Sequence, residues 1–161
     1  IILLLMLSAV WPPDSPWSPW WKTNKDAGGV VIKLADITSK DTVYELGSGD
    51  GEFLLLAAFK THAKCVGIEI DPLRYVIAQF RIKLSGLSSQ ITIKRKNFYD
   101  EDISPATVVY VYLLPRVVKQ LTPKFKKELK KGTRVISYRY TISDLRLVKE
   151  NKKHKLYFYE I

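Results

Sequence analysis

The sequence contains few of the residues that build disulfide frameworks and metal centres. Cysteine occurs once, as Cys65, and histidine twice, as His62 and His154, in 161 residues. A single cysteine excludes an internal disulfide framework and argues against a cysteine-based metal site. The two histidines lie apart, each near an expected turn, which argues against zinc binding and histidine-based catalysis. We therefore expect no metal cofactor and a reducing, cytoplasmic compartment.

Long apolar runs are also missing. Ile1–Val10 is apolar except at Ser8, but Pro12 and Pro13 follow it, and a spanning helix needs about 20 residues. The segment lacks the basic leading region of a signal peptide. We expect no transmembrane span. Ile1–Val10 either packs on the domain or docks on a membrane or a partner, and the sequence leaves both open.

Thermolabile residues are scarce, and acidic residues are outnumbered. Asn and Gln occur three times each beside abundant Lys, a composition typical of heat-adapted proteins that predicts a thermophilic source. The net charge is +10, from 26 Lys and Arg against 16 Asp and Glu. Such a surface attracts acidic partners. Acidic proteins and nucleic acid both qualify, and the sign of the charge does not separate them.

The length and the 47% hydrophobic content predict one domain over residues 1–161. Its first 25 residues form an apolar segment rich in Trp and Pro. Trp11–Trp21 holds four tryptophans and four prolines, and prolines at that density prevent regular structure. The segment is expected to be a strap over the core or a lid beside a cofactor and a substrate channel.

The most informative stretch runs from Glu45 to Gly51, with the sequence Glu-Leu-Gly-Ser-Gly-Asp-Gly. Thr42–Leu46 is predicted as a buried strand, Gly47–Gly51 as a tight turn, Glu52–Lys60 as a helix and Cys65–Ile70 as a second strand. This is one βαβ unit. Glycines in its first loop tolerate positive φ and let the backbone approach a ligand closely.

The spacing of these glycines favours one class of ligand. They occupy alternate positions, whereas the dinucleotide fingerprint is Gly-x-Gly-x-x-Gly. Glu45 would repel a phosphate, but it can lie near the ammonium group of a methionine moiety. Glu69 ends the second strand, where a carboxylate can accept both hydroxyls of a ribose. The pattern favours S-adenosylmethionine over NAD; the alternative is a turn that binds nothing.

Further helices are predicted on both sides of this unit. Asp26–Ile37 has helical apolar spacing. A helix starts at Pro72 and ends at Gly86, marked by the apolar residues Leu73, Val76, Ile77, Phe80 and Leu84. Arg116–Leu121 is predicted as a short helix, followed by a second helix that begins at Thr122-Pro123 and runs to Lys131.

The remaining strands complete an α/β pattern. Ile91–Lys96, Thr107–Leu114 and Thr133–Tyr138 are predicted strands, and Leu145–Lys149 with Lys155–Ile161 forms a terminal hairpin. Alternating strands and helices predict a mostly parallel central sheet flanked by helices, with ligands at the carboxyl ends of the strands. The hairpin makes the last strand antiparallel.

Over nearly the whole chain these residues resemble the Rossmann-like fold of class I S-adenosylmethionine-dependent methyltransferases, with motif I at Glu45–Gly51. The resemblance implies S-adenosylmethionine as cofactor and S-adenosylhomocysteine as product. It implies that Asn97 and Phe98, after the third strand, flank the adenine. The full set of implied cofactor contacts is Glu45, Leu46, Gly47, Ser48, Gly49, Gly51, Glu69, Ile70, Asn97, Phe98 and Tyr112.

The segment Val111–Pro115, Val-Tyr-Leu-Leu-Pro, resembles the motif after the fourth strand in a small family of protein-lysine methyltransferases. That family includes a broad-specificity archaeal enzyme and mitochondrial enzymes that act on membrane carriers and the ATP synthase c-ring. Ser15–Trp20, Leu46–Gly51 and Lys131–Ser137 are similar to it too. The resemblance implies a monomeric enzyme of broad specificity, able to methylate itself, that acts on lysine-containing proteins, acidic or chromatin-associated ones among them. It implies a substrate channel lined by Tyr112, Trp17, Trp20 and Tyr138.

The sequence lacks the motifs that characterise several other classes of methyltransferase. Enzymes that methylate the amino group of adenine or the amide of glutamine carry Asp or Asn followed by Pro-Pro-aromatic after the fourth strand, and Tyr112–Pro115 does not. RNA cytosine methyltransferases of the C5 type need a nucleophilic cysteine, for which Cys65 is misplaced. Arginine methyltransferases need paired glutamates. An RNA or DNA methyltransferase that uses the basic surface for weak nucleic-acid contact remains the alternative, followed by a binding module without chemistry.

Overall fold

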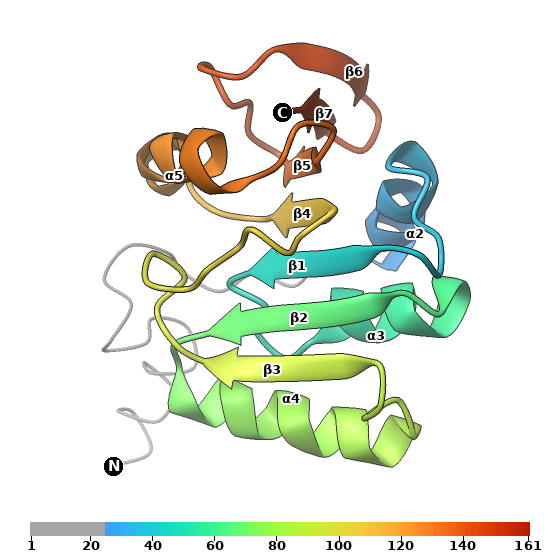
Figure 1. The fold of residues 1–161 in the computed structure, drawn as a ribbon. Helices are drawn as coiled ribbons and strands as arrows, with labels where there is room; N and C mark the ends of the chain where they lie inside the picture. Colours follow the sequence, from blue (N-terminus) through green and yellow to red (C-terminus); the bar gives the residue numbers. More distant parts are fainter. Residues whose placement is uncertain (1–24) are drawn as a thin grey trace.

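A seven-stranded sheet forms the centre of the molecule in the computed structural model, which describes residues 25–161 (Figure 1). The strand order is β3-β2-β1-β4-β5-β7-β6. The strands are β1 (Thr42–Leu46), β2 (Lys64–Glu69), β3 (Ile91–Arg95), β4 (Val108–Val111), β5 (Arg134–Tyr138), β6 (Leu147–Asn151) and β7 (Leu156–Glu160). The first five are parallel, and β7 runs antiparallel to both β5 and β6. The predicted parallel sheet with a terminal hairpin is confirmed.

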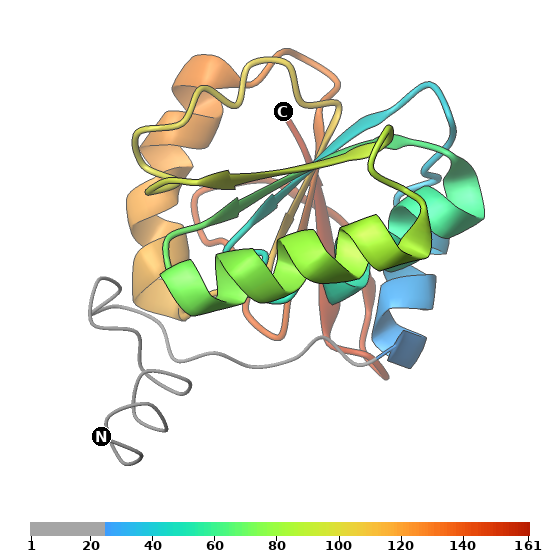
Figure 2. The same cartoon turned by 90° about the horizontal axis from the view of Figure 1, so that it is seen from below.

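Helices cover both faces of the sheet, as Figures 1 and 2 show. They are α2 (Lys25–Leu34), α3 (Glu52–Thr61), α4 (Pro72–Ser85) and α5 (Pro115–Glu128). Residues of α2, α3 and α4 share one buried core with alternate residues of the strands, and α5 shares a second core on the opposite face. In β1, for example, Val43 lies in the first core and Tyr44 in the second, because successive side chains of a strand point to opposite faces. No helix in the described part of the chain is long and apolar enough to cross a membrane.

The prediction of two helices between residues 116 and 131 was wrong, because α5 is one continuous helix with Pro123 inside it. Proline removes one helical hydrogen bond and costs about 3 kcal/mol. The helix nevertheless buries an apolar row on both sides of the proline, from Val117 to Phe125. Burying each such side chain contributes about 1.5–3 kcal/mol, so the packing on the sheet outweighs the cost of the proline.

The apolar residues that predicted α4 do not form its packed face. The helix lies where expected, but Leu73, Val76, Ile77, Phe80 and Leu84 are 41–71% exposed, whereas Arg74, Ala78 and Ile82 are buried. Polar contacts fix this rotation. The Gln79 amide donates to the Ile93 carbonyl oxygen at 3.3 Å, and Arg81 pairs with acidic residues at the start of α3.

Several element ends differ by a few residues from the prediction. The helix α2 ends at Leu34 instead of Ile37, and Asp36 turns the chain with a φ of 48°. Strand β2 ends at Glu69, and β4 ends at Val111. Tyr112 and the residues up to Leu114 therefore lie in the loop beyond the carboxyl end of β4 instead of in the strand.

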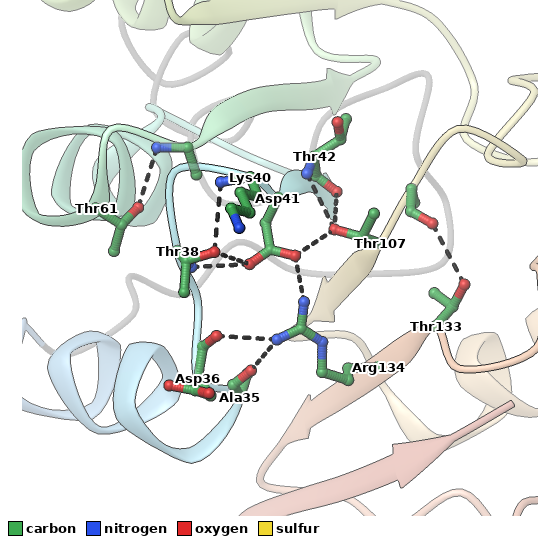
Figure 3. Close-up of polar contacts among 12 residues, drawn as sticks. Ala35, Asp36, Thr38, Lys40, Asp41, Thr42, Thr61, Thr107, Thr133 and Arg134 are labelled. Atoms are coloured by element: carbon green, nitrogen blue, oxygen red, sulfur yellow. Dashed lines mark hydrogen bonds and ion pairs between the residues drawn. The ribbon is translucent and has the colours of Figure 1, made fainter.

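A polar cluster around Asp41 holds the amino ends of three strands together (Figure 3). The carboxylate accepts hydrogen bonds from the Thr38 amide at 2.8 Å and the Thr107 hydroxyl at 2.7 Å, and it pairs with Arg134. Arg134 also donates to the carbonyl oxygens of Ala35 and Asp36. The cluster joins the α2–β1 loop to Thr107, which precedes β4, and to Arg134, the first residue of β5. It lies at the amino ends of the strands, opposite the glycine loop.

Removing the charge of Asp41 should destabilise the fold. Burial raises the pKa of this carboxyl, but the hydrogen bonds from Thr38 and Thr107 and the Arg134 charge outweigh burial and hold its pKa below the usual range. We expect Asp41→Asn to lower the free energy of unfolding at pH 7 by about 2 kcal/mol. Because the folded-state pKa is depressed, the difference should persist above about pH 4 and vanish as the pH falls through the folded-state pKa. Urea unfolding of both proteins from pH 7 to pH 3 measures this. An unchanged midpoint at pH 7 would contradict it.

Candidate functional site

The glycine loop adopts the left-handed conformation at each of its three glycines. The φ angles of Gly47, Gly49 and Gly51 are 79°, 54° and 75°, a region that residues with a Cβ rarely adopt. The amides of Gly47 and Ser48 donate to the Ile68 carbonyl oxygen at 2.9 and 3.0 Å, which ties the loop to the end of β2. The loop thus turns its backbone toward the carboxyl edge of the sheet.

Glu69, the last residue of β2, connects this loop to the next one. Its Oε2 accepts the Gly49 amide at 2.7 Å, and its Oε1 accepts the Asp71 amide at 2.9 Å. The residue is 5% exposed, and its burial raises the pKa of the carboxyl although the two amides act in the opposite direction. Each carboxylate oxygen still has a free lone pair, so the group can accept two further hydrogen bonds.

Glu45 and Ser48 carry buried polar atoms without a partner. Within residues 25–161, neither Oε2 of Glu45 nor Oγ of Ser48 has a hydrogen-bond partner. Burial, and then the negative charges of Asp50 and Glu69, raise the pKa of Glu45 well above its usual value. Buried polar atoms are nearly always paired in folded proteins. Two such atoms beside a glycine loop indicate that a bound molecule completes the site.

Two arginines of α4 offset the negative charge around the loop. Arg81 pairs with the Asp50 carboxylate at 2.9 Å, donates to the Asp50 carbonyl oxygen at 2.9 Å and pairs with Glu52. Arg74 is buried, and burial lowers its pKa while the neighbouring acids, Glu69 first, act to raise it. Helix α4 therefore fixes the loop from one side and supplies the positive charge that its acids need.

The remaining residues of the predicted cofactor set lie at or near the same edge. Ile70 follows β2, and Asn97 and Phe98 lie just beyond β3; all three are half-buried. The Oδ1 of Asn97 accepts the Tyr99 amide at 3.1 Å, which leaves its Nδ2 for a ligand. Leu46 differs, because its side chain is fully buried in the core and only its backbone faces the loop.

Tyr112, which follows β4, and Tyr138, the last residue of β5, form an aromatic pair. Their ring centroids lie 4.6 Å apart at an angle of 56°, and burial raises the pKa of Tyr112. The Arg139 guanidinium lies 5.7 Å from the Tyr112 ring centroid and 5.6 Å from that of Tyr138. The structure brings these two predicted channel residues together, whereas Trp17 and Trp20 lie outside the described residues.

Arg139 has a role here that the sequence analysis missed. Its φ is 70°, unusual for a residue with a Cβ. Its amide donates to the Lys155 carbonyl oxygen at 2.7 Å, and the Ser137 hydroxyl bonds to the Tyr140 carbonyl oxygen at 2.6 Å. These two bonds hold the turn that places a cation over both rings. No pattern in the sequence signals a left-handed arginine.

Cys65 and the acidic groups form no further reactive centre in the part of the chain that the structure describes. The Cys65 side chain is buried, and burial followed by the Glu45 charge raises the pKa of the thiol to about 12. It is therefore neither accessible nor ionised at neutral pH. Among residues 25–161, no group of three or more His, Cys, Asp and Glu side chains is arranged to hold a metal ion.

Comparison with known proteins gives one family and several relatives. Residues 45–149 match the ANTKMT methyltransferase domain. A protein-lysine N-methyltransferase of Saccharolobus islandicus (strain REY15A) is 35% identical, over 91% of this chain and 95% of that protein. The adenine nucleotide translocase lysine N-methyltransferase of Mus musculus is 31% identical, over 61% of this chain and 43% of the mouse protein.

Among solved structures, an RNA methyltransferase from Salinibacter ruber in complex with S-adenosyl-L-homocysteine has a TM-score of 0.84. It is 33% identical and covers 88% of this chain and 94% of its own. A SAM-dependent methyltransferase from Geobacter sulfurreducens, 16% identical with a TM-score of 0.64 over 74% of this chain and 51% of its own, shares the fold.

The buried acid at Glu45 should cost stability in the protein without ligand. Because its folded-state pKa is raised, the unfolded chain ionises first, and the protein loses stability as the pH rises above about 4.3. We expect Glu45→Gln to raise the free energy of unfolding by about 1–3 kcal/mol at pH 8 and to change it little at pH 4. Thermal unfolding of the ligand-free protein at both pH values measures this. The control is the exposed Glu160→Gln, expected within about 0.5 kcal/mol. A Glu45→Gln protein less stable than the parent at pH 8 would contradict the account.

Proposed function

Since residues 45–149 match its domain, the chain belongs to the ANTKMT methyltransferase family, and we propose that it is an S-adenosylmethionine-dependent protein-lysine N-methyltransferase. The main supporting observation is the Tyr112–Tyr138 pair, which lies at the carboxyl ends of β4 and β5 with a cation over both rings. Aromatic faces that attract a guanidinium also attract other cations, a lysine ammonium among them. The similarity to a lysine methyltransferase over nearly the full length of both chains supports the same substrate.

The glycine loop fits S-adenosylmethionine on the evidence of its own atoms. The unpaired Glu45 Oε2 and Ser48 Oγ are buried acceptors, suited to an ammonium group. A Cβ on Gly47 would lie 3.2 Å from Leu113 Cδ2, so a side chain there would crowd the space beside the loop. The free lone pairs of Glu69 suit two ribose hydroxyls, and Ile70, Asn97 and Phe98 would flank the adenine. When bound, the cofactor supplies an electrophilic methyl group on a sulfonium.

The chain's own contribution to the reaction is to desolvate and orient the lysine. At pH 7 only about one free lysine in 2,500 is neutral, because its pKa is about 10.4. Burial against the rings of Tyr112 and Tyr138 would disfavour the ammonium form of the lysine, which would release its proton to solvent. The Arg139 guanidinium lies over both rings, so an entering lysine would have to displace it. Val108–Pro115 contains neither an acid nor a histidine, and we assign no general base.

RNA methylation is the second candidate, because the Salinibacter ruber structure, similar over most of both chains, is described as an RNA methyltransferase. The net charge of +10 would also suit RNA. Two observations favour protein. The buried Cys65, with a thiol pKa of about 12, excludes the cysteine-based C5 mechanism. The second is that the Saccharolobus islandicus relative, similar over nearly the full length of both chains, is described as a protein-lysine N-methyltransferase.

Finer features of the function remain predictions. They are broad specificity, self-methylation, a monomeric state, acidic or chromatin-associated substrates, one domain over residues 1–161, and a thermophilic, archaeal and cytoplasmic setting. The net charge of +10 supports acidic substrates. The small size of the chain supports broad specificity, because it offers little area for reading a substrate sequence.

A direct assay separates the two candidate functions. The protein is incubated with S-adenosylmethionine labelled on its methyl group, together with a set of unrelated soluble proteins or with total RNA. We expect label on lysines of several proteins and of the enzyme itself, located by mass spectrometry, and none in RNA. Label in RNA alone would overturn the lysine proposal. Label on a single protein would contradict broad specificity only.

Substitutions at Tyr112 test the desolvating channel. We expect Tyr112→Phe to keep much of the single-turnover rate, because its ring still excludes water and orients the amine. Tyr112→Ala should lose about 2–4 kcal/mol of transition-state stabilisation with a smaller change in cofactor affinity. The rate should rise with pH as the lysine deprotonates, without an early plateau from an enzyme base. If Tyr112→Phe is as inactive as Tyr112→Ala, the hydroxyl carries the chemistry and the channel account is wrong.

A further inference from the structure

An apolar stripe on α4 faces solvent. The side chains are Leu73, Val76, Ile77, Phe80 and Leu84, spaced so that they lie along one side of the helix. They make up five of the eight large apolar side chains that are exposed in residues 25–161. Single exposed apolar residues are ordinary, but a contiguous set of this kind marks a surface that another body covers.

The packing of α4 shows that the stripe is not a displaced core face. The side of the helix that faces the sheet holds Arg74, Ala78 and Ile82, which are 6%, 0% and 3% exposed. Asp71 caps the first turn by accepting the Arg74 amide at 2.8 Å, and Arg81 fastens the helix to Asp50 and Glu52. The rotation of α4 is therefore fixed, and the apolar stripe is held outward.

The charged side chains within α4 itself are of one sign. Between Pro72 and Ser85 the chain has three basic residues and no acidic one. Lys83 is exposed on the helix, and Arg95 is exposed at the end of the neighbouring strand β3. An exposed apolar stripe with basic residues beside it is the arrangement of a helix that lies in the interface of an anionic bilayer. Figure 2, which looks onto α4, shows the helix running along the outside of the sheet.

We propose that this face of α4 docks on the surface of an anionic lipid bilayer. Its apolar side chains would enter the boundary between headgroups and acyl chains, while Lys83 and Arg95 would meet lipid phosphates. The sequence carries a second membrane-seeking feature, the apolar Ile1–Val10 followed by four tryptophans, a residue type that concentrates at membrane interfaces. Two weak signals acting together are what stable peripheral binding requires. A second copy of the chain is a poorer occupant, since each copy carries a net charge of +10.

The chain offers a closely matched pair of variants for the test. Val76 on α4 is 60% exposed, and Val148 on β6 is 51% exposed. Strands β3 and β6 are the opposite edges of the sheet, and α4 lies beside β3. Val76→Glu and Val148→Glu therefore make the same chemical change and the same change of net charge at opposite ends of the molecule. Both variants keep Ile1–Val10.

The measurement is cosedimentation of the full chain with vesicles of phosphatidylcholine, with and without phosphatidylglycerol. We expect the parent protein and Val148→Glu to bind the anionic vesicles equally, and Val76→Glu to bind about tenfold more weakly. High salt should weaken binding of the parent without abolishing it, because the apolar contribution is not screened. Methylation of a soluble lysine peptide should be unchanged in both variants.

Five outcomes would overturn the proposal. Three of them come from the vesicle measurement: no binding of the parent to anionic vesicles, equal binding of all three proteins, and equal weakening in both variants, which would reflect net charge alone. The fourth is a parent dimer in sedimentation velocity that Val76→Glu dissociates, which would assign the face to a second copy. If Val76→Glu alone lowers the melting temperature by several degrees, another part of the chain covers the stripe and the proposal is equally overturned. Because binding needs no cofactor, none of these results depends on the proposed function.

Discussion

The architecture of the site depends on one buried carboxylate. Glu69 ends β2 and accepts the amides of Gly49 and Asp71 on its two oxygens. Gly49 belongs to the loop between β1 and α3, and Asp71 is the cap of α4, so one side chain sets the positions of two loops and a helix start. A carboxylate that accepts two amides is firmly oriented, and its remaining lone pairs face a fixed direction. The rest of the site is assembled around it.

The cost of this arrangement is a concentration of negative charge in a buried place. The pKa of Glu45 is raised by burial and by the charges of Asp50 and Glu69, and the pKa of Glu69 is itself raised by burial. Arg74 and Arg81, which lie about two turns apart on α4, offset part of this charge. The Glu45 and Ser48 atoms have no hydrogen-bond partner among residues 25–161, so this part of the chain does not complete the compensation. A cationic ligand such as the proposed cofactor would complete it, and strongly shifted pKa values of this kind mark candidate functional sites.

The amino ends of the strands carry stabilising contacts, and the carboxyl ends carry the candidate site. At the amino ends of the strands, the Asp41 carboxylate accepts hydrogen bonds from Thr38 and Thr107 and pairs with Arg134 (Figure 3). At the carboxyl ends of the strands lie the glycine loop, Glu69 and the Tyr112–Tyr138 pair. Arg139, beside the pair, has a positive φ angle that residues with a Cβ rarely adopt. Strain and unsatisfied groups persist only where the surrounding structure fixes them. The paired polar groups at the amino ends of the strands supply that rigidity, and the carboxyl ends can therefore keep unpaired groups for a ligand.

The sequence by itself determined the order of strands and helices, the glycine loop and the acid at Glu69, because these follow from local periodicity, from the φ angles that glycine alone tolerates and from strand ends. The resemblance to lysine methyltransferases named Tyr112 and Tyr138 as channel residues, and the structure places their rings in contact. Only the tertiary structure decided the rest. Pro123 lies inside α5 because burial on the sheet outweighs the local cost of proline. Arg139 lies over the rings because bonds to Lys155 and within the Ser137–Tyr140 turn hold it there. The apolar set of α4 faces outward because Asp71, Gln79 and Arg81 fix the rotation of the helix. A helical period in the sequence shows that an apolar stripe exists, but it does not show which side of the helix the protein buries.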